Sequence, residues 1–501
     1  MLQDRRTVTI LTLVLCFIYV AVRVWRLTDT CLWFDEIFSV HAAEHSWNSL
    51  LWFVAQDLIH PPLFYVMLKL WIGVGGESLI WLRLFPVVFS VLALVPFINL
   101  CRELKLKTSA GLLALRFLTV NGSLIKYAQE VRMYAPLLFL SLLSLWLFSR
   151  FYYRGKNIWL LTIVNVLLIY THYFGWFVIA AEVVAIFVFQ RVKIRHVLFM
   201  STISFVAFVP WIFAIVKAAN GGADVTQNIG WMTRPGLRPI LDFAFDVIEP
   251  FYFQQSSAEA TTILYITVPL LIVIVIAKVF YVVDWKKQED KSAFYLMNIF
   301  VLAPMIVAFA ISWLSPVSIW GSRHLIIVFG PIAIVVGIFI TSIRIKALRY
   351  GLIGLTLVLF VGALVVRLRT PQADYVWCAW EELAPNIPAD SPEKLFVFED
   401  LVAYHFWFST RHRQGLEILK VEGVPEIAED SAYFLPRSFS GVRSVGVDGI
   451  EGDRIWLAFR NPVWNEDRPP LSIIRNLGYS LGAPRTVSVG GTSAILVEAR
   501  H

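Results

Sequence analysis

Two carboxylates stand in an unusually apolar stretch near the start of the chain, CLWFDEIFSV at residues 31–40. Asp35 and Glu36 are the two acids, and tryptophan, phenylalanine and isoleucine residues flank them on both sides. A positioned carboxylate can accept the proton that a hydroxyl group loses as it attacks a carbon centre. Asp35 could equally be a solvated loop acid, so the segments around it have to decide between the two interpretations.

Further ionisable residues stand at the ends of apolar segments, where charges are costly and usually mark a pathway or a site. They occur in QDLIHPPL at 56–63, KYAQEVRMYA at 126–135, THYFGW at 171–176 and GSRHLI at 321–326. Together, acids and bases at one membrane surface could bind an anionic headgroup and deprotonate a hydroxyl. With Asp35 as the candidate base, the candidate binding residues are Glu36, Asp57, His60, Lys126, Glu130, Arg132, Tyr134, His172, Tyr173 and Arg323.

Each of these residues also has a purely structural interpretation. Lys126 and Glu130 are four positions apart, so on a helix they can neutralise each other. Arg132 and Arg323 could be anchors whose charges reach the membrane surface. The His-Tyr pair at 172–173 fits the aromatic belt at the ends of membrane spans. The joint pattern, more than any single residue, favours a site.

The composition places the chain in a membrane. Of its 501 residues, 58% are hydrophobic and only 16% are charged, and the mean hydropathy is +0.68. A soluble protein of this size would expose too much apolar surface. The net charge of +7 does not indicate nucleic acid binding, because the basic residues lie in short loops between apolar segments.

The four cysteines are scattered and show no metal-ligand spacing. Cys31 and Cys378 could meet outside the membrane, but two unpaired thiols are expected. The first apolar segment, 7–25, is long enough to cross a bilayer and no small-residue cleavage site follows it, so it is expected to be a retained anchor.

The apolar segments predict eleven membrane spans. The segment 63–74 is not counted, because it is short and contains Lys69, and it is expected to lie along the interface or to re-enter. The predicted spans are 7–25, 79–100, 108–125, 133–150, 157–174, 175–190, 196–216, 261–283, 293–313, 323–343 and 350–367.

The positive-inside rule then orients the chain with its N-terminus in the cytoplasm. The short basic clusters all fall on that side: Arg102, Lys105, Lys107; Arg150, Arg154, Lys156; Arg191, Lys193, Arg195; Lys286, Lys287, Lys291; Arg344, Lys346, Arg349. The first external loop, 26–78, and a long loop, 217–260, therefore face outward with the other candidate residues. Two domains are expected, a membrane domain at 1–367 and an external one at 368–501.

The external domain is expected to be a small α/β unit, because apolar strand-like and helix-like segments alternate in it. The predicted strands are 394–400 and 453–459, and the predicted helices are 401–410 and 470–481.

The order of the motifs resembles the GT-C superfamily of membrane glycosyltransferases. The motifs are FDE, D-x-x-HPPL-x-Y, WLRLFP with Arg83, KYAQEVRMYA and YTHYFGW. The chain is most similar to the bacterial branch with protein O-mannosyltransferase-like enzymes and the lipid A and lipopolysaccharide-core sugar transferases. The resemblance is good over 30–190 and weaker over 200–370. It implies a polytopic α-helical membrane protein of about 11 spans with a small C-terminal extracytoplasmic α/β domain.

The resemblance also implies an activity: a hexosyl or pentosyl group moves, with inversion, from a polyprenyl-phosphate donor to an extracytoplasmic acceptor hydroxyl. It maps the catalytic base onto Asp35. The anomeric carbon becomes oxocarbenium-like, and Arg132, Lys126 or Arg323 could stabilise the departing lipid phosphate. The implied partners are the donor lipid, membrane lipids and a glycan, lipid or protein acceptor, without nucleic acid. The implied location is the plasma (inner) membrane, with the C-terminal domain outside the cytoplasm.

Two features of the family do not transfer directly. Some relatives have a lysine before the Pro-Pro pair, and His60 stands there in this chain, which puts a phosphate contact at this position in doubt. Oligosaccharyltransferase-type relatives hold a divalent ion with separated acids, and Asp35 with Asp57 could do the same. A monophosphate donor next to three cationic side chains needs a metal less, so no metal cofactor is expected. No glycine-rich nucleotide motif is present.

Two other classes compete with the transferase. A transporter or lipid flippase would also have many spans, but it predicts paired repeats and interrupted helices at corresponding positions, which the sequence lacks. A receptor or scaffold that binds through its external tail would not explain why polar residues gather in the first external loops. Replacement of Asp35 by Asn separates the classes, because only a transferase should lose its activity.

Overall fold

The computed structural model describes residues 5–251, 261–283, 291–369, 375–389, 393–427, 434–437, 439–461, 463–489 and 491–501. Its compact units are a membrane unit, Met1–Leu27 with Ala43–Pro371, and a sheet unit, Thr28–Ala42 with Gln372–His501. The predicted domains placed 28–42 with the membrane spans, whereas by its contacts this segment belongs to the sheet unit. Lys286 and Lys287 of the predicted cytoplasmic loops, and the end of the predicted 217–260 loop, lie outside the described residues.

Helices dominate the membrane unit. In the described part of the chain, eight helical segments are long and apolar enough to cross a membrane, and each matches a predicted span. They are α1 Arg5–Val24; α5 Leu79–Leu92 with α6 Leu94–Glu103; α9 Tyr134–Arg154; η1 Arg191–Lys193 with α12 Ile194–Asn220; α15 Thr261–Val283; α16 Lys291–Leu314; η3 His324–Val328 with α17 Phe329–Thr341; and α18 Lys346–Arg369. The other three predicted spans are shorter apolar helices, α7 Thr108–Val120, α10 Ile158–Thr171 and α11 Gly175–Phe189. The prediction of a polytopic α-helical membrane fold is confirmed.

One predicted span, 108–125, ends earlier than expected. Helix α7 stops at Val120, and Asn121 becomes the N-cap of a separate helix, α8 Gly122–Gln129. The Asn121 side chain accepts a hydrogen bond from the Leu124 N–H at 2.8 Å and donates one to the Val247 carbonyl at 2.7 Å. Asparagine favours this position because its side chain replaces a missing backbone partner at the helix start.

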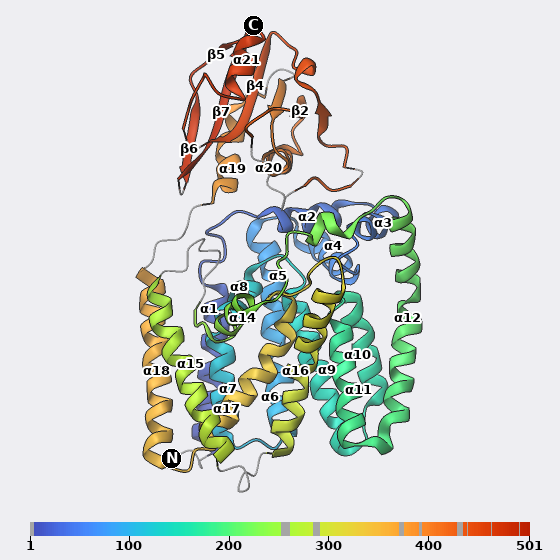
Figure 1. Ribbon diagram of the computed structural model, residues 1–501, viewed down its shortest axis with the longest axis vertical. Coiled ribbons are helices and arrows are strands. Elements are labelled where there is room, and N and C mark those ends of the chain that lie inside the picture. Colours follow the sequence, from blue (N-terminus) through green and yellow to red (C-terminus); the bar gives the residue numbers. More distant parts are fainter. Residues whose placement is uncertain are drawn as a thin grey trace. The chain divides into compact units, whose positions relative to one another are not determined.

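Short helices gather toward one end of the membrane unit, the upper end in Figure 1. They are α3 Trp47–Asp57, α4 Leu63–Gly75, α8, α13 Val225–Ile229 and α14 Leu237–Ile248. Helix α4 covers the segment that was excluded as a span. The Lys69 side chain of α4 donates hydrogen bonds to the carbonyls of Ala43 and His45 at 2.9 and 2.7 Å. These carbonyls lie at the C-terminal end of helix α2, Phe34–Glu44.

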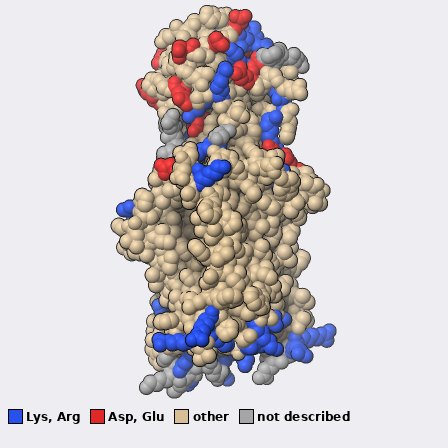
Figure 2. Space-filling view, turned by 90° about the vertical axis from the view of Figure 1, so that its right-hand side faces the viewer, with Lys and Arg blue, Asp and Glu red and all other residues tan. Residues whose placement is uncertain are grey.

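Lysine and arginine side chains gather at the opposite end of the membrane unit (Figure 2). Arg102 at the end of α6, and Lys105 and Lys107 in the loop before α7, are exposed basic residues. Next to this basic end, Figure 2 shows a broad band almost without charged side chains. The long helices of the unit expose large apolar side chains such as Phe17, Phe199 and Val358. An apolar belt next to a basic rim is the pattern of a protein that spans a bilayer.

A mixed sheet forms the sheet unit. Its order over the described residues is β3-β2-β1-β4-β7-β5, with β6 paired to β7. The β3-β2-β1-β4 pairs are parallel, and those of β7 are antiparallel. The strands are β1 Glu393–Val397, β2 Leu416–Val421, β3 Arg443–Val445, β4 Arg454–Asn461, β5 Ser480–Leu481, β6 Arg485–Val489 and β7 Thr492–Arg500. The helical segments are η4 Val376–Cys378, α19 Ala379–Leu383, η5 Ala384–Asn386, α20 Asp400–Thr410, η6 Val447–Gly449 and α21 Leu471–Asn476.

Alternate residues of the strands build a core on each face of this sheet. Leu395 and Val397 face the helix residues Trp380 and Phe406 on one side, whereas Phe396 packs with residues of α21 on the other. Period-two burial with helices on both faces is what a mostly buried sheet requires. The predicted α/β unit is therefore present.

The predicted helix at 470–481 is wrong in its second half. Helix α21 ends at Asn476, and Ser480 and Leu481 form β5 opposite Arg500 and Ala499. Gly478 has a φ of +95°, a conformation that glycine adopts without steric cost and that ends the helix.

The expectation that Cys31 and Cys378 are unpaired thiols is also wrong. Cys31 and Cys378, which are 347 residues apart, form a disulfide with a Cα–Cα distance of 5.5 Å. Both cysteines belong to the sheet unit. Disulfides persist mainly in oxidising compartments outside the cytoplasm.

Candidate active site

Five polar residues meet near the short helices at the end of the membrane unit opposite its basic end. We call Asp57, His60, Arg132, His172 and His324 the histidine cluster. Asp57 ends α3 and His60 precedes α4, where Leu58 turns the chain with a φ of 62°. Arg132 lies in the turn between α8 and α9, His172 follows α10, and His324 begins η3.

Hydrogen bonds link Asp57, His60 and Arg132 in a row. His60 Nδ1 lies 2.8 Å from Asp57 Oδ2, and His60 Nε2 lies 3.3 Å from Arg132 Nη2. A guanidinium can only donate, so His60 Nε2 must accept, and Nδ1 then carries the hydrogen donated to Asp57. This Asp57–His60–Arg132 relay fixes the histidine tautomer and holds the arginine side chain in place.

His172 offers a buried hydrogen-bond donor beside this relay. Its Nδ1 accepts from the Phe174 N–H at 3.1 Å, and its Nε2 has no hydrogen-bond partner among the described residues. Its ring lies 5.9 Å from that of His60 and 5.5 Å from that of His324. Burial, and then the nearby positive charges, hold the pKa of His172 well below its usual value, so the imidazole is neutral and Nε2 carries the hydrogen.

Asp57 is the titratable acid of the cluster. Burial raises its pKa from 3.8 to about 7, although the positive charge of Arg132 acts in the opposite direction. Asn228 of α13 donates to Asp57 Oδ1 at 3.1 Å. Near it, Tyr173 accepts a hydrogen bond from Trp211 Nε1 at 3.2 Å, and burial raises the pKa of Tyr173 above its usual value.

A second group of candidates borders the histidine cluster. Lys126 Nζ lies 3.9 Å from Glu130, which is the pairing expected four positions apart. The Tyr134 ring lies 5.0 Å from that of Tyr127 and 6.4 Å from that of His172. Burial raises the pKa of Tyr127 to about 12, against the effects of Lys126 and of a hydrogen bond with Ser322.

Arg323 follows Ser322, and its guanidinium lies 5.2 Å from the centre of the Trp231 ring. Its charge lowers the pKa of both Tyr127 and His172. The structure thus brings nine of the predicted residues into one neighbourhood: Asp57, His60, Lys126, Glu130, Arg132, Tyr134, His172, Tyr173 and Arg323.

Asp35 and Glu36 belong to the sheet unit and are described with it. Both lie in the first turn of α2, where acids favour a helix N-terminus. Glu36 is fully buried and accepts a hydrogen bond from the Trp33 N–H at 3.1 Å. Asp35 is half-buried. The predicted assignment of the base to Asp35 therefore remains a prediction.

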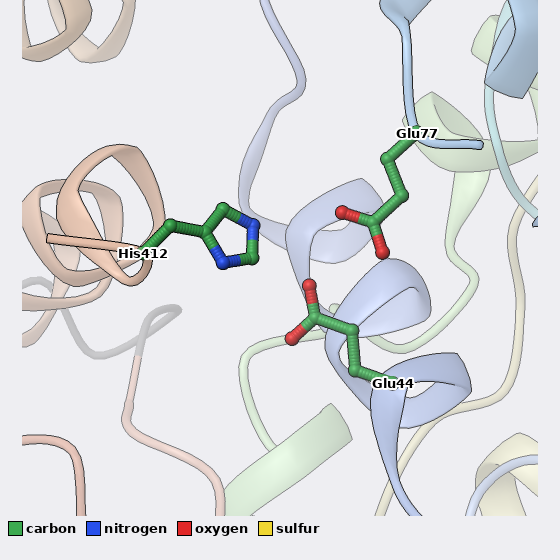
Figure 3. Close-up of side chains that lie close together, drawn as sticks. All are labelled: Glu44, Glu77 and His412. Atoms are coloured by element: carbon green, nitrogen blue, oxygen red, sulfur yellow. The ribbon is translucent and has the colours of Figure 1, made fainter.

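Two further carboxylates of the membrane unit lie close together. Oxygens of Glu44, at the end of α2, and Glu77, before α5, come within 4.8 Å (Figure 3). His412, also labelled in Figure 3, belongs to the sheet unit and is not counted with them. Glu44 is exposed and Glu77 half-buried, and such pairs are common on protein surfaces.

The set of predicted residues omitted several partners. Asn228 and Trp231 follow α12, and Trp211 lies within the second half of α12; no local motif marks them. His324 lies in GSRHLI, a segment already singled out for its ionisable residues, although it was not among the predicted binding residues. Tyr127 lies within KYAQEVRMYA, where its position at a span boundary was a usable signal.

The fold of this chain, a helical membrane unit with a mixed sheet, is similar to that of a solved membrane protein, ArnT. The solved structure of ArnT from Cupriavidus metallidurans in the apo state matches 98% of this chain and 97% of that chain, with a TM-score of 0.59 and 12% identity. ArnT from the same organism bound to undecaprenyl phosphate matches 99% and 98%, with a TM-score of 0.59 and 11% identity. At these identities the likeness concerns the fold. No protein-family model and no curated protein matches the chain.

Proposed function

We propose that this protein transfers a glycosyl group from a polyprenyl-phosphate donor to a hydroxyl group of an acceptor outside the cytoplasm. The observation that carries this proposal is the Asp57–His60–Arg132 relay at the outer end of an ArnT-like fold. An arginine that a relay holds in place is suited to a planar, bidentate contact with phosphate. ArnT, a protein with the same fold, binds undecaprenyl phosphate.

The donor phosphate binds at the histidine cluster. Arg132 supplies a fixed positive charge, His172 Nε2 a buried N–H donor, and Arg323 and Lys126 further charge at the border. As the bond from the anomeric carbon to the phosphate oxygen breaks, its electron pair goes to the phosphate. Donors that are already in place stabilise this charge without reorganisation. His60 takes part through Arg132, which explains how a histidine can replace the lysine of some relatives.

The acceptor hydroxyl loses its proton to Asp35 as its oxygen bonds to the anomeric carbon. Attack opposite to the leaving phosphate in a single displacement inverts the configuration at that carbon. The transferred group is a hexosyl or pentosyl sugar, and the acceptor is a glycan, a lipid or a protein. The reaction uses no resident metal ion in this proposal, since His60 and Asn228 already engage the carboxylate of Asp57.

The protein resides in the plasma (inner) membrane with its N-terminus in the cytoplasm. The basic end of the membrane unit supports this orientation through the positive-inside rule. The Cys31–Cys378 disulfide supports an extracytoplasmic sheet unit, because such bonds are rare in the cytoplasm. A transporter would bind its substrate near the middle of the membrane, whereas the histidine cluster lies among the short helices at one end of the membrane unit.

Binding of undecaprenyl phosphate to the purified protein tests the phosphate site. Arg132→Ala should weaken binding about tenfold to 100-fold, the loss expected for one charge-assisted contact. Arg238→Ala is the matched control, because this arginine of the outer helix α14 is 94% exposed and outside the cluster. Equal affinities for the wild type and Arg132→Ala would overturn the proposed donor site.

A further inference from the structure

We propose that the sheet unit is the positioning element for Asp35, held there by the Cys31–Cys378 disulfide and an aromatic clamp around His41. The inference rests on the proposed function, in which Asp35 is the base. Asp35 lies in the segment Thr28–Ala42, which packs with Gln372–His501 in the sheet unit. In the sequence, the helices of the membrane unit separate these two parts of the sheet unit.

The disulfide fixes the beginning of this segment. Cys31 lies three residues before the start of α2, and Cys378 ends η4, directly before α19. Trp380 of α19 is fully buried in the core on one face of the sheet. The chain that enters α2 is therefore covalently attached to a core element of the sheet unit.

An aromatic clamp fixes the same helix two turns further on. His41 Nδ1 lies 2.9 Å from the Tyr404 hydroxyl, and the His41 ring lies 4.5 Å from that of Trp407. The Phe34 ring lies 5.0 Å from that of Tyr404. Phe34 and His41 are seven positions apart, so they share one face of the helix, and that face contacts α20 of the sheet unit.

Between these two attachments, hydrogen bonds among residues of the segment itself stabilise the first turn of α2. Glu36 accepts the Trp33 N–H, and the Ser39 hydroxyl donates to the Asp35 carbonyl at 2.9 Å. Asp35 thus sits on a helix turn with fixed ends, one residue after Phe34 of the clamp. The disulfide and the aromatic contacts on either side of its carboxylate lie in the sheet unit, which makes Cys31, Cys378, His41 and Tyr404 positioning residues in this proposal.

A positioning role and a merely structural role predict different losses. A structural role lowers the stability of the protein and affects every activity to a similar degree. A displaced base slows the chemical step and leaves the phosphate site of the membrane unit intact, and misplacement by about 1 Å can cost about 100-fold in rate. Turnover and donor-lipid affinity therefore have to be measured on the same preparations.

The experiment compares Cys378→Ser and Tyr404→Phe with the wild type in proteoliposomes that contain lipid extract of the source cells. The readouts are the initial rate of polyprenyl phosphate release, the affinity for undecaprenyl phosphate and the melting temperature. Cys101→Ser is the matched control, because Cys101 is a free cysteine of the membrane unit. Cys378→Ser should lower the rate about tenfold or more, Tyr404→Phe less, and neither should change the affinity by more than about twofold. The milder Tyr404→Phe variant keeps the test valid if Cys378→Ser does not fold.

A double-mutant cycle with Asp35→Asn identifies the residue through which the disulfide acts. If Cys378 acts through Asp35, Asp35→Asn combined with Cys378→Ser should be no slower than Asp35→Asn alone. Full turnover in folded Cys378→Ser and Tyr404→Phe, or losses that multiply in the cycle, would overturn the positioning role. Full turnover in Asp35→Asn itself would instead overturn the proposed function.

Discussion

At the scale of single residues, the direction of each hydrogen bond in the relay defines the site. Arg132 can only donate, His60 must accept on Nε2 and donate from Nδ1, and Asp57 must accept. Asp57 accepts on both carboxyl oxygens, from His60 on Oδ2 and from Asn228 on Oδ1, which favours its charged form. Since burial raises the pKa of this acid to about 7, the relay is sensitive to pH in the physiological range.

Donor binding should accordingly change with pH. As the pH rises through about 7, ionised Asp57 completes the relay, and the affinity for undecaprenyl phosphate should increase about threefold to tenfold, the value of one hydrogen bond. The effect on the stability of the fold has the opposite sign. The folded protein holds the Asp57 proton more tightly than the unfolded chain does, so protonation stabilises the folded state. This stabilisation is complete below pH 3.8 and is lost as the pH rises through about 7.

Titration of binding from pH 5.5 to 8.5 checks this prediction, with Asp57→Asn as the comparison. The phosphate group of the lipid titrates in the same pH range. The pH dependence of binding that persists in Asp57→Asn therefore measures the contribution of the lipid phosphate. Identical pH profiles for the two proteins would contradict the role of Asp57.

At the scale of elements, polar side chains decide where apolar helices end and how they associate. Hydropathy predicted the long spans well, because about 20 apolar residues have few alternatives to crossing the bilayer. It missed the end of α7, because the side chain of Asn121 outweighs the apolar residues around it. It also missed β5, because a glycine with positive φ ends the preceding helix and the pairing with β7 is not local.

A buried network between α9, α10 and α11 gives a prediction at this scale. Ser144 Oγ lies 2.6 Å from Asn165 Oδ1 and 2.7 Å from Glu182 Oε1, and Asn165 Nδ2 lies 2.7 Å from Glu182 Oε2. The hydroxyl has one hydrogen, so Ser144 cannot donate to both oxygens. If the Asn165 amide group is turned so that its nitrogen faces Ser144, its oxygen then lies beside Glu182 Oε2. Two oxygens at this distance need a hydrogen between them. Either arrangement requires a proton on Glu182.

Glu182→Gln should therefore be tolerated, because its amide can donate where the protonated acid did. Glu182→Ala leaves buried groups unpaired and should cost about 1–3 kcal/mol. Thermal unfolding in detergent of the wild type and both variants provides the comparison. A glutamine variant as unstable as the alanine variant would mean that Glu182 is charged.

At the scale of the whole molecule, two units divide the proposed chemistry. The membrane unit provides the phosphate site, and the sheet unit carries the segment with Asp35. Hydropathy and alternating segments predicted the helical membrane fold and the α/β unit, and nine of the residues predicted for the site lie in one neighbourhood. Their role in binding phosphate and their outward orientation stay predictions. The sequence could not assign residues 28–42 to the sheet unit, because a contact across 347 residues leaves no local pattern.

Mass spectrometry of envelope glycans and polyprenyl-phosphate sugars is the most direct test of glycosyl transfer by this protein. Cells that lack the gene are compared with the same cells after restoration with the wild type, Asp35→Asn or Arg132→Ala. We predict that one sugar modification is missing, that its donor lipid accumulates, and that only the wild type restores the modification. Unchanged glycans and donor lipids in every strain would contradict the account.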